Sequence, residues 1–160
     1  MGLYYFLDAS AIVKYYVDEP GSVWVEEIVD LLDSETRTRG NTVFIAEVSI
    51  AEVAAAFAIL HRTGRIRRRT RDGVFDRFLA EADTFFKLTP IVSGDFYTAA
   101  RLTQRHPLKA YDAIQLAIAL RYQALARRKL NLIFVSGDKQ LLRAAAAEGL
   151  ATDNPFDHLP

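Results

Sequence analysis

Short apolar runs alternate along the chain with segments whose apolar side chains recur at helical spacing. Runs without polar alternation suit strands that are buried on both faces, as in parallel sheets. We expect strands at 3–7, 43–45, 87–92, 131–135 and 150–152, the third short or at an edge because it contains Pro90. We expect helices at 11–17, 22–32, 48–61, 72–86, 93–105, 108–125 and 139–148. The alternation predicts an α/β fold.

Two aspartates directly follow expected strands. Asp8 comes after the run 3–7, and Asp138 comes after 131–135 and the pair Ser136-Gly137. In open α/β folds, ligands bind outside the carboxyl ends of the strands, at a switch point of the topology. Both aspartates therefore stand where chemistry is expected, although Asp8 or Ser10 could instead simply cap the helix that follows.

Two further acids lie on apolar helix faces. Glu52 falls beside the stripe of Val53, Phe57 and Leu60 in the helix 48–61. Asp112 lies in the most apolar helix of the chain, which has almost no polar side. An unpaired buried carboxylate costs several kcal/mol or becomes protonated. Glu52 therefore needs a partner, either a metal ion or an arginine from elsewhere in the fold, and Asp112 either serves the same site or complements the helix dipole.

These four carboxylates would repel one another if the fold brought them together. Each pair at about 4 Å repels by about 4 kcal/mol at an effective dielectric constant of 20. A cation would relieve this repulsion, and oxygen ligands favour a hard ion such as Mg2+, with Mn2+ as a substitute. The three histidines are scattered without metal-ligand spacing. A magnesium site of this kind predicts nuclease or phosphatase chemistry.

Composition narrows the class of protein. At 160 residues we expect one domain spanning 1–160. The chain has no cysteine, which excludes disulfides, thiolate nucleophiles and zinc–sulfur sites. It shows neither an apolar run of roughly 20 residues nor a signal-peptide pattern, so we expect a cytoplasmic protein with no membrane span. Neither a dinucleotide-binding G-x-G-x-x-G, a P-loop nor a G-x-S-x-G elbow is present.

Charge is unevenly distributed although the formal net charge is zero. From Met1 to Glu35 there are eight acids and one base, Lys14, whereas the segment 62–71 holds six arginines and no acid. Guanidinium groups bind phosphates well, so this cluster could contact a nucleic-acid backbone or an acidic partner, or could simply be solvated. Lys14, Arg65, Arg67 and Arg68 are the residues that we expect to contact nucleic acid.

Four motifs together resemble the PIN domain, and more narrowly the VapC-type toxin ribonucleases of type II toxin–antitoxin modules. They are DASAIVK at 8–14, SIAEV at 49–53, LKAYDAIQLA at 108–117 and SGDKQLLRAA at 136–145. The resemblance spans essentially the whole chain. It implies a three-layer α/β/α sandwich around a central, mainly parallel sheet, and a Mg2+-dependent endoribonuclease.

Carried onto this sequence, the resemblance makes Asp8, Glu52, Asp112 and Asp138 the catalytic metal ligands, supported by Ser10 and Ser136. Ser136 occupies a place that the family often fills with threonine. The resemblance also implies a homodimer and a small antitoxin that inserts into the active-site groove. The alternatives are a housekeeping PIN nuclease, a non-catalytic interaction module and a receiver-like phosphoacceptor domain. The last would need paired acids near the first strand and a lysine after the last strand, whereas Lys139 is next to Asp138. A phosphatase with an aspartyl nucleophile would need a second aspartate two residues after Asp8, where Ser10 stands. The RNA target, the cleavage sequence, the number of metal ions and the role of the arginine cluster stay open.

Overall fold

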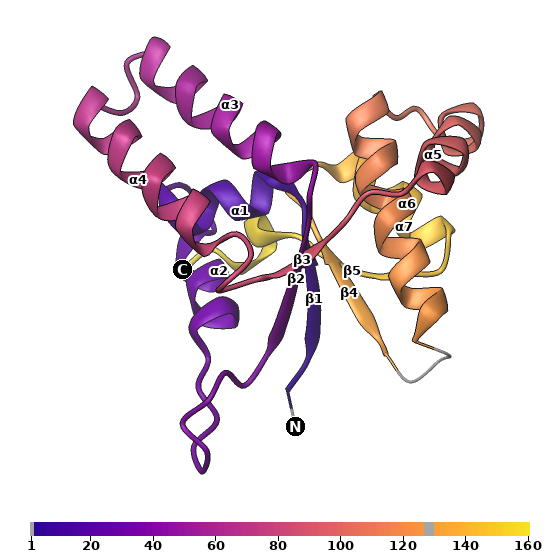
Figure 1. The fold of residues 1–160 in the computed structure, drawn as a ribbon, viewed down its shortest axis with the longest axis horizontal. Helices are drawn as coiled ribbons and strands as arrows, with labels where there is room; N and C mark the ends of the chain where they lie inside the picture. The colour runs from indigo at the N-terminus through magenta and orange to yellow at the C-terminus, as the bar shows by residue number, and fades with distance from the viewer. Residues whose placement is uncertain (1, 127–129) are drawn as a thin grey trace.

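A computed structural model describes residues 2–126 and 130–160. Five strands form one sheet in the order β3-β2-β1-β4-β5, and every neighbouring pair is parallel (Figure 1). The strands are β1 (Tyr4–Leu7), β2 (Thr42–Ala46), β3 (Lys87–Thr89), β4 (Leu132–Val135) and β5 (Ala151–Asp153). The strand before Pro90 is indeed short and at the edge, as expected from the missing N–H of proline.

Helices connect the strands. They are α1 (Ala9–Tyr16), α2 (Ser22–Asp30), α3 (Ser49–Arg62), α4 (Arg68–Glu81), α5 (Ser93–Arg105), α6 (Ala110–Leu125) and α7 (Lys139–Ala147), and a 3-10 turn, η1 (Pro155–His158), follows β5. The ends of α4 differ from the expected helix 72–86. Arg67 has an extended backbone and is the N-cap of α4, which therefore starts four residues earlier than expected. The helix stops at Glu81, and beyond it Phe85 and Phe86 pack against Tyr15.

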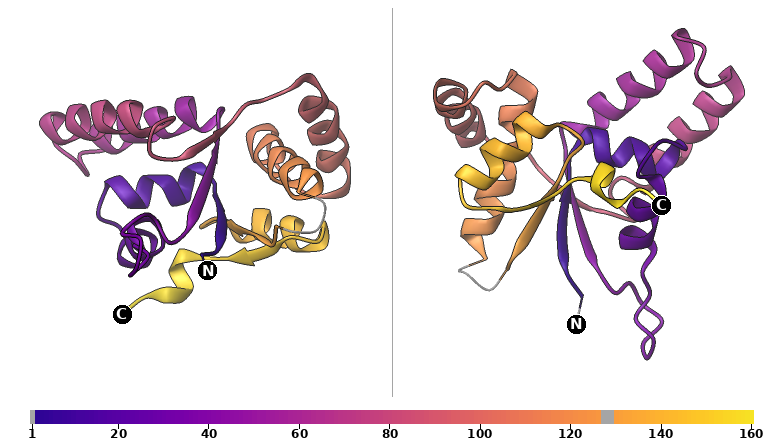
Figure 2. Two further views of the ribbon diagram at one scale, coloured as in Figure 1. Left: turned by 60° about the horizontal axis from the view of Figure 1, so that its bottom comes forward. Right: turned by 180° about the vertical axis from the view of Figure 1, so that it is seen from behind.

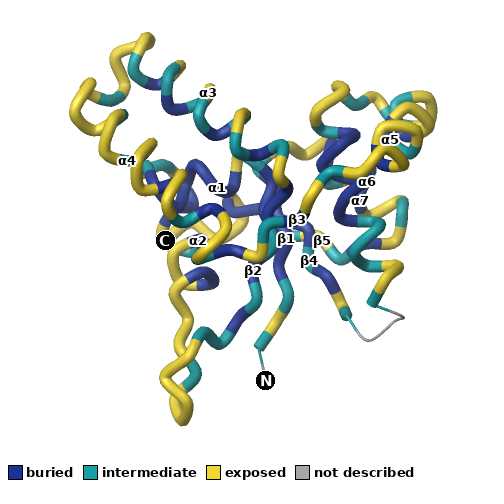
Figure 3. Tube along the Cα trace, in the orientation of Figure 1, coloured by how far each residue is buried: buried dark blue, intermediate teal, exposed yellow. Residues whose placement is uncertain are grey.

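The helices cover both faces of the sheet and complete the expected three-layer sandwich (Figure 2). Successive strand residues point to opposite faces. Tyr5 and Leu7 pack with α1 to α4, whereas Phe6 packs with α5 to α7 and stacks on Phe134 with ring centroids 5.6 Å apart. Two hydrophobic cores therefore hold β1 rigidly at the centre of the molecule, where the trace is almost entirely buried (Figure 3).

The topology reverses at β1. The chain proceeds from β1 to β2 and β3 on one side, and β4 and β5 fill the other side. The carboxyl ends of β1 and β4 thus form the switch point at which open α/β folds bind ligands. Asp8 directly follows β1, and Ser136 directly follows β4.

Asp95 illustrates a buried acid with a purely structural explanation. It lies in the first turn of α5, where a carboxylate complements the helix dipole, and it accepts a hydrogen bond from the Val92 backbone N–H at 2.9 Å. It is also paired with Arg121 of α6 at 2.8 Å. Asp95 therefore needs no ligand. None of the helices in the described ranges is long and apolar enough to cross a membrane.

Candidate active site

Asp8 is buried and is held through both of its carboxylate oxygens. It is only 5% exposed, and its Oδ1 accepts hydrogen bonds from the Ala11 backbone N–H at 2.9 Å and the Ser10 hydroxyl at 2.7 Å. Its Oδ2 accepts the Ser136 hydroxyl at 2.5 Å. Asp8 is thus the N-cap of α1, as the simpler interpretation proposed, but it also joins the ends of β1 and β4.

The segment after β4 closes this network. The Ser136 hydroxyl oxygen accepts the Asp138 backbone N–H at 3.0 Å, and the Ser10 hydroxyl oxygen accepts the Gly137 backbone N–H at 2.9 Å. Asp138 caps α7 by accepting the Gln140 and Leu141 backbone N–H groups. The two serines predicted as supporting residues therefore fix Asp8 relative to the loop that carries Asp138.

Glu52 has a partner that the sequence interpretation missed. The buried Gln115 of α6 donates from Nε2 to Glu52 Oε1 at 3.0 Å and to the Ser49 hydroxyl at 2.6 Å. The sequence did contain a signal for this contact: Gln115 lies three residues after Asp112 in a nearly apolar helix, and a buried amide needs a polar partner. Glu52 is held by an amide, and no arginine in the described residues pairs with it, so the proposed arginine partner is wrong.

Electrostatics link the four acids. Burial, followed by the charge of Asp112, raises the pKa of Asp8 to about 6 despite its three lowering hydrogen bonds. Burial, with contributions from Asp8 and Asp112, raises the pKa of Glu52 to about 7. Burial and the charge of Asp138 raise the pKa of Asp112, whereas the charge of Lys109 lowers it. The fold therefore brings all four carboxylates close enough for their charges to interact, although they come from four separate segments.

The donor chemistry suits a hard divalent cation, since the four acids offer only carboxylate oxygens and repel one another. As the side chains stand, no group of three aspartates, glutamates or histidines in the described residues is arranged to hold a metal ion. The carboxylates of Asp8, Glu52 and Asp138 instead accept hydrogen bonds from hydroxyl, amide and backbone N–H donors. The site thus fits a cation in charge and ligand type, and the metal-ligand assignment stays a prediction.

The residues predicted to contact nucleic acid occupy two different environments. Lys14 is 4% exposed and its Nζ lies 3.3 Å from Glu19 Oε2, so it is not a free surface cation. Arg65, Arg67 and Arg68 are exposed on the α3–α4 hairpin. Arg65 lies 3.9 Å from Glu19, and Arg68 lies 3.8 Å from Asp72. These contacts are long, so both guanidinium groups stay available to an anionic partner.

A family model described as the PIN domain matches residues 5–147. The chain belongs to the PIN domain family. PIN domains are typically nucleases, and those nucleases generally use divalent metal ions. This membership confirms the family and the fold that the four motifs implied.

Among solved structures, the chain resembles one described as "Crystal structure of PAE2754 from Pyrobaculum aerophilum". The TM-score is 0.59 at 17% sequence identity, over 97% of this chain and 85% of that one. At this identity the likeness establishes the fold alone. A search of curated protein sequences finds no match.

The raised pKa of Asp8 predicts how stability varies with pH. Because the folded protein holds this proton more tightly than the unfolded chain does, the contribution of Asp8 is fully present below pH 3.8 and is lost as the pH rises through about 6. Without divalent ions, the free energy of unfolding of the parent protein should fall as the pH rises. Compared with that of the Asp8→Asn variant, it should fall by about 3 kcal/mol between about pH 4 and pH 8. Urea denaturation in EDTA at pH 4 to 8 measures it. Asp76→Asn, at an exposed position of α4, should track the parent, and parallel curves for parent and Asp8→Asn would contradict the raised pKa.

Proposed function

We propose that the protein is a Mg2+-dependent endoribonuclease that hydrolyses RNA phosphodiester bonds at the four-carboxylate site. The observation that carries the proposal is the electrostatic coupling among the predicted site acids: Asp112 contributes to the raised pKa values of Asp8 and Glu52, and the charge of Asp138 contributes to that of Asp112. Membership of a family of nucleases supports the reaction class.

In this proposal Asp8, Asp112 and Asp138 hold one or two Mg2+ ions, directly or through water, and Mn2+ is the substitute. When bound, such an ion supplies positive charge at the phosphoryl group and lowers the pKa of coordinated water. Glu52 would orient the attacking water or serve as a ligand of a second ion, and Gln115 donates a hydrogen bond that positions the carboxylate of Glu52. Ser10 and Ser136 hold Asp8 in one rotamer through both of its oxygens.

Replacing Asp8 tests the catalytic assignment. Asp8→Asn keeps the shape of the side chain but removes its charge, so it should lower cleavage of a generic single-stranded RNA at least a hundredfold in millimolar Mg2+. EDTA should abolish the activity of the parent protein, and Mn2+ should restore it. Asp76→Asn is the matched control. Cleavage by Asp8→Asn at the parental rate would overturn the assignment, and no cleavage by the parent with either metal would favour a non-catalytic interaction module.

Thermal unfolding tests metal binding independently of catalysis. Mg2+ relieves the repulsion only in the folded state, so a concentration ten times Kd should stabilise the protein by about 1.4 kcal/mol. For a chain of 160 residues, this corresponds to a rise in Tm of about 3–5 °C. The Asp112→Asn variant should show a much smaller rise. Equal shifts for parent and variant would place the ion elsewhere.

We further propose that the protein is the toxin of a type II toxin–antitoxin pair and forms a homodimer. The order and spacing of the four motifs support this finer assignment over a housekeeping nuclease. A short open reading frame next to its gene should encode a DNA-binding antitoxin that co-purifies with the protein and suppresses its RNase activity. Sedimentation velocity should give twice the chain mass. A neighbouring gene product that neither binds nor inhibits would favour the housekeeping nuclease.

A further inference from the structure

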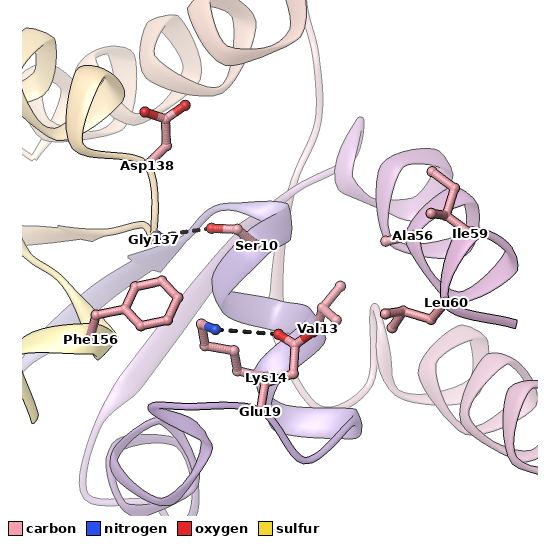
Figure 4. A pocket seen from close by; sticks show the side chains of 10 residues that line it. All are labelled: Ser10, Val13, Lys14, Glu19, Ala56, Ile59, Leu60, Gly137, Asp138 and Phe156. Carbon is pink, nitrogen blue, oxygen red and sulfur yellow. Dashed lines mark hydrogen bonds and ion pairs between the residues drawn. The ribbon is translucent and has the colours of Figure 1, made fainter. Parts of the chain in front are cut away.

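A cavity of about 460 Å³ opens beside the acid site (Figure 4). Ser10, Gly137 and Asp138 form one end of it, so the cavity reaches the site through Asp138 and through Ser10, whose hydroxyl donates to Asp8. The remaining wall is largely apolar and consists of Val13, Ala56, Ile59, Leu60 and Phe156. Its volume is in the range of cavities that hold small organic groups, about 300–1,000 Å³.

Lys14 and Glu19 form a charged pair in the wall of the cavity, and Glu19 Oε1 also lies 3.9 Å from the Arg65 guanidinium. The side chains of Lys14 and Glu19 are 5% and 15% exposed, and Lys14 Nζ lies 3.3 Å from Glu19 Oε2. Both side chains line the cavity, so an ammonium donor and a carboxylate acceptor stand side by side in mostly apolar surroundings. Such a pair offers a flat ligand a specific hydrogen-bonding edge.

Phe156 provides an aromatic wall that is held in place from several sides. Lys14 Nζ lies 4.2 Å from the ring centroid, and a Cβ at Gly137 would lie only 3.0 Å from the ring. Next to it in η1, His158 stacks on Trp24 of α2 with centroids 4.2 Å apart. Phe156 as a whole residue is 42% exposed, which leaves part of it accessible to a planar group.

We propose that this cavity binds the base of the nucleotide adjoining the scissile phosphate, and that it prefers guanine. A phosphodiester placed at Asp8 and Asp138 carries its neighbouring nucleoside toward the cavity, because Ser10 and Asp138 belong to both. Exposed aromatic rings stack on any base, so Phe156 would supply affinity without specificity. The inference rests on the RNA-cleaving function proposed above.

The hydrogen-bonding groups of Lys14 and Glu19 determine which base the cavity prefers. Guanine presents two adjacent donors, N1–H and N2–H, beside the acceptor O6, and these match a carboxylate next to an ammonium. Adenine offers one donor beside an acceptor nitrogen, and neither pyrimidine presents two adjacent donors. Glu19 would therefore accept from guanine N1–H and N2–H, and Lys14 would donate to O6.

Two variants test the cavity without disturbing the acids. Ile59→Trp fills the cavity from a position on α3 that is 51% exposed, so folding should be preserved. Glu19→Gln keeps the shape of Glu19 and an acceptor oxygen for Lys14 but loses one of the two acceptors that guanine needs. Leu125→Trp, on an exposed residue at the opposite end of α6 from Asp112, is the control for the added indole. Glu27→Gln, on the exposed side of α2, is the control for the lost charge.

The first measurement is cleavage of RNA oligonucleotides that differ at one position next to a mapped cut. Guanine should raise kcat/KM about tenfold over adenine, which corresponds to one well-placed hydrogen bond. Glu19→Gln should remove most of this preference while Mg2+-dependent cleavage persists, and Ile59→Trp should raise KM about tenfold for all substrates. The two control variants should match the parent protein.

The second measurement needs no cleavage and therefore separates this inference from the proposed function. Ligand-observed NMR in EDTA with guanosine, inosine and adenosine as probes should show guanosine binding best, with inosine weakened by its missing 2-amino group. Both Glu19→Gln and Ile59→Trp should lose the guanosine signal. Equal signals for the three nucleosides, or an Mg2+-dependent nuclease with no base preference, would overturn the inference and leave the function intact. Loss of inhibition by an antitoxin in Ile59→Trp, with unchanged RNA kinetics, would make the cavity a protein-docking site and would also overturn it.

Discussion

Repulsion among buried carboxylates is the constraint on which the site depends. Asp8, Glu52 and Asp112 have raised pKa values because each is partly or wholly buried near another acid. A fold tolerates such a cluster only where other interactions hold the groups in place. Here the sheet supplies them, since two hydrophobic cores fix β1 and the ends of β1 and β4 converge.

The hydrogen bonds around the acids position them more than they neutralise them. Asp8 is held at both oxygens by Ser10 and Ser136, and Glu52 is held by Gln115. These donors are uncharged, so the negative potential of the cluster remains available to a divalent cation. The same serines tie the segment of Asp138 to β1, which makes the site a single unit although its acids are far apart along the chain.

The cations that we expect to contact nucleic acid lie in two environments. Arg65, Arg67 and Arg68 of the α3–α4 hairpin are exposed and suit contact with a polyanion. Lys14 is buried with Glu19 beneath Phe156, where it borders the cavity next to the acids. We expect the arginines to govern overall affinity for RNA and the Lys14–Glu19 pair to govern the choice of base.

The sequence by itself determined the fold class, the strands and most helices, because uninterrupted apolar runs and helical spacing are local signals, as in 3–7 and 108–125. It also singled out Glu52 and Asp112, whose apolar surroundings left no nearby partner. Only the tertiary structure decided where α4 starts and that Lys14 is buried. It also decided the ion pair of Asp95 with Arg121 and the hydrogen bond from Gln115 to Glu52. Each of these depends on contacts between segments distant along the chain, which local periodicity does not encode.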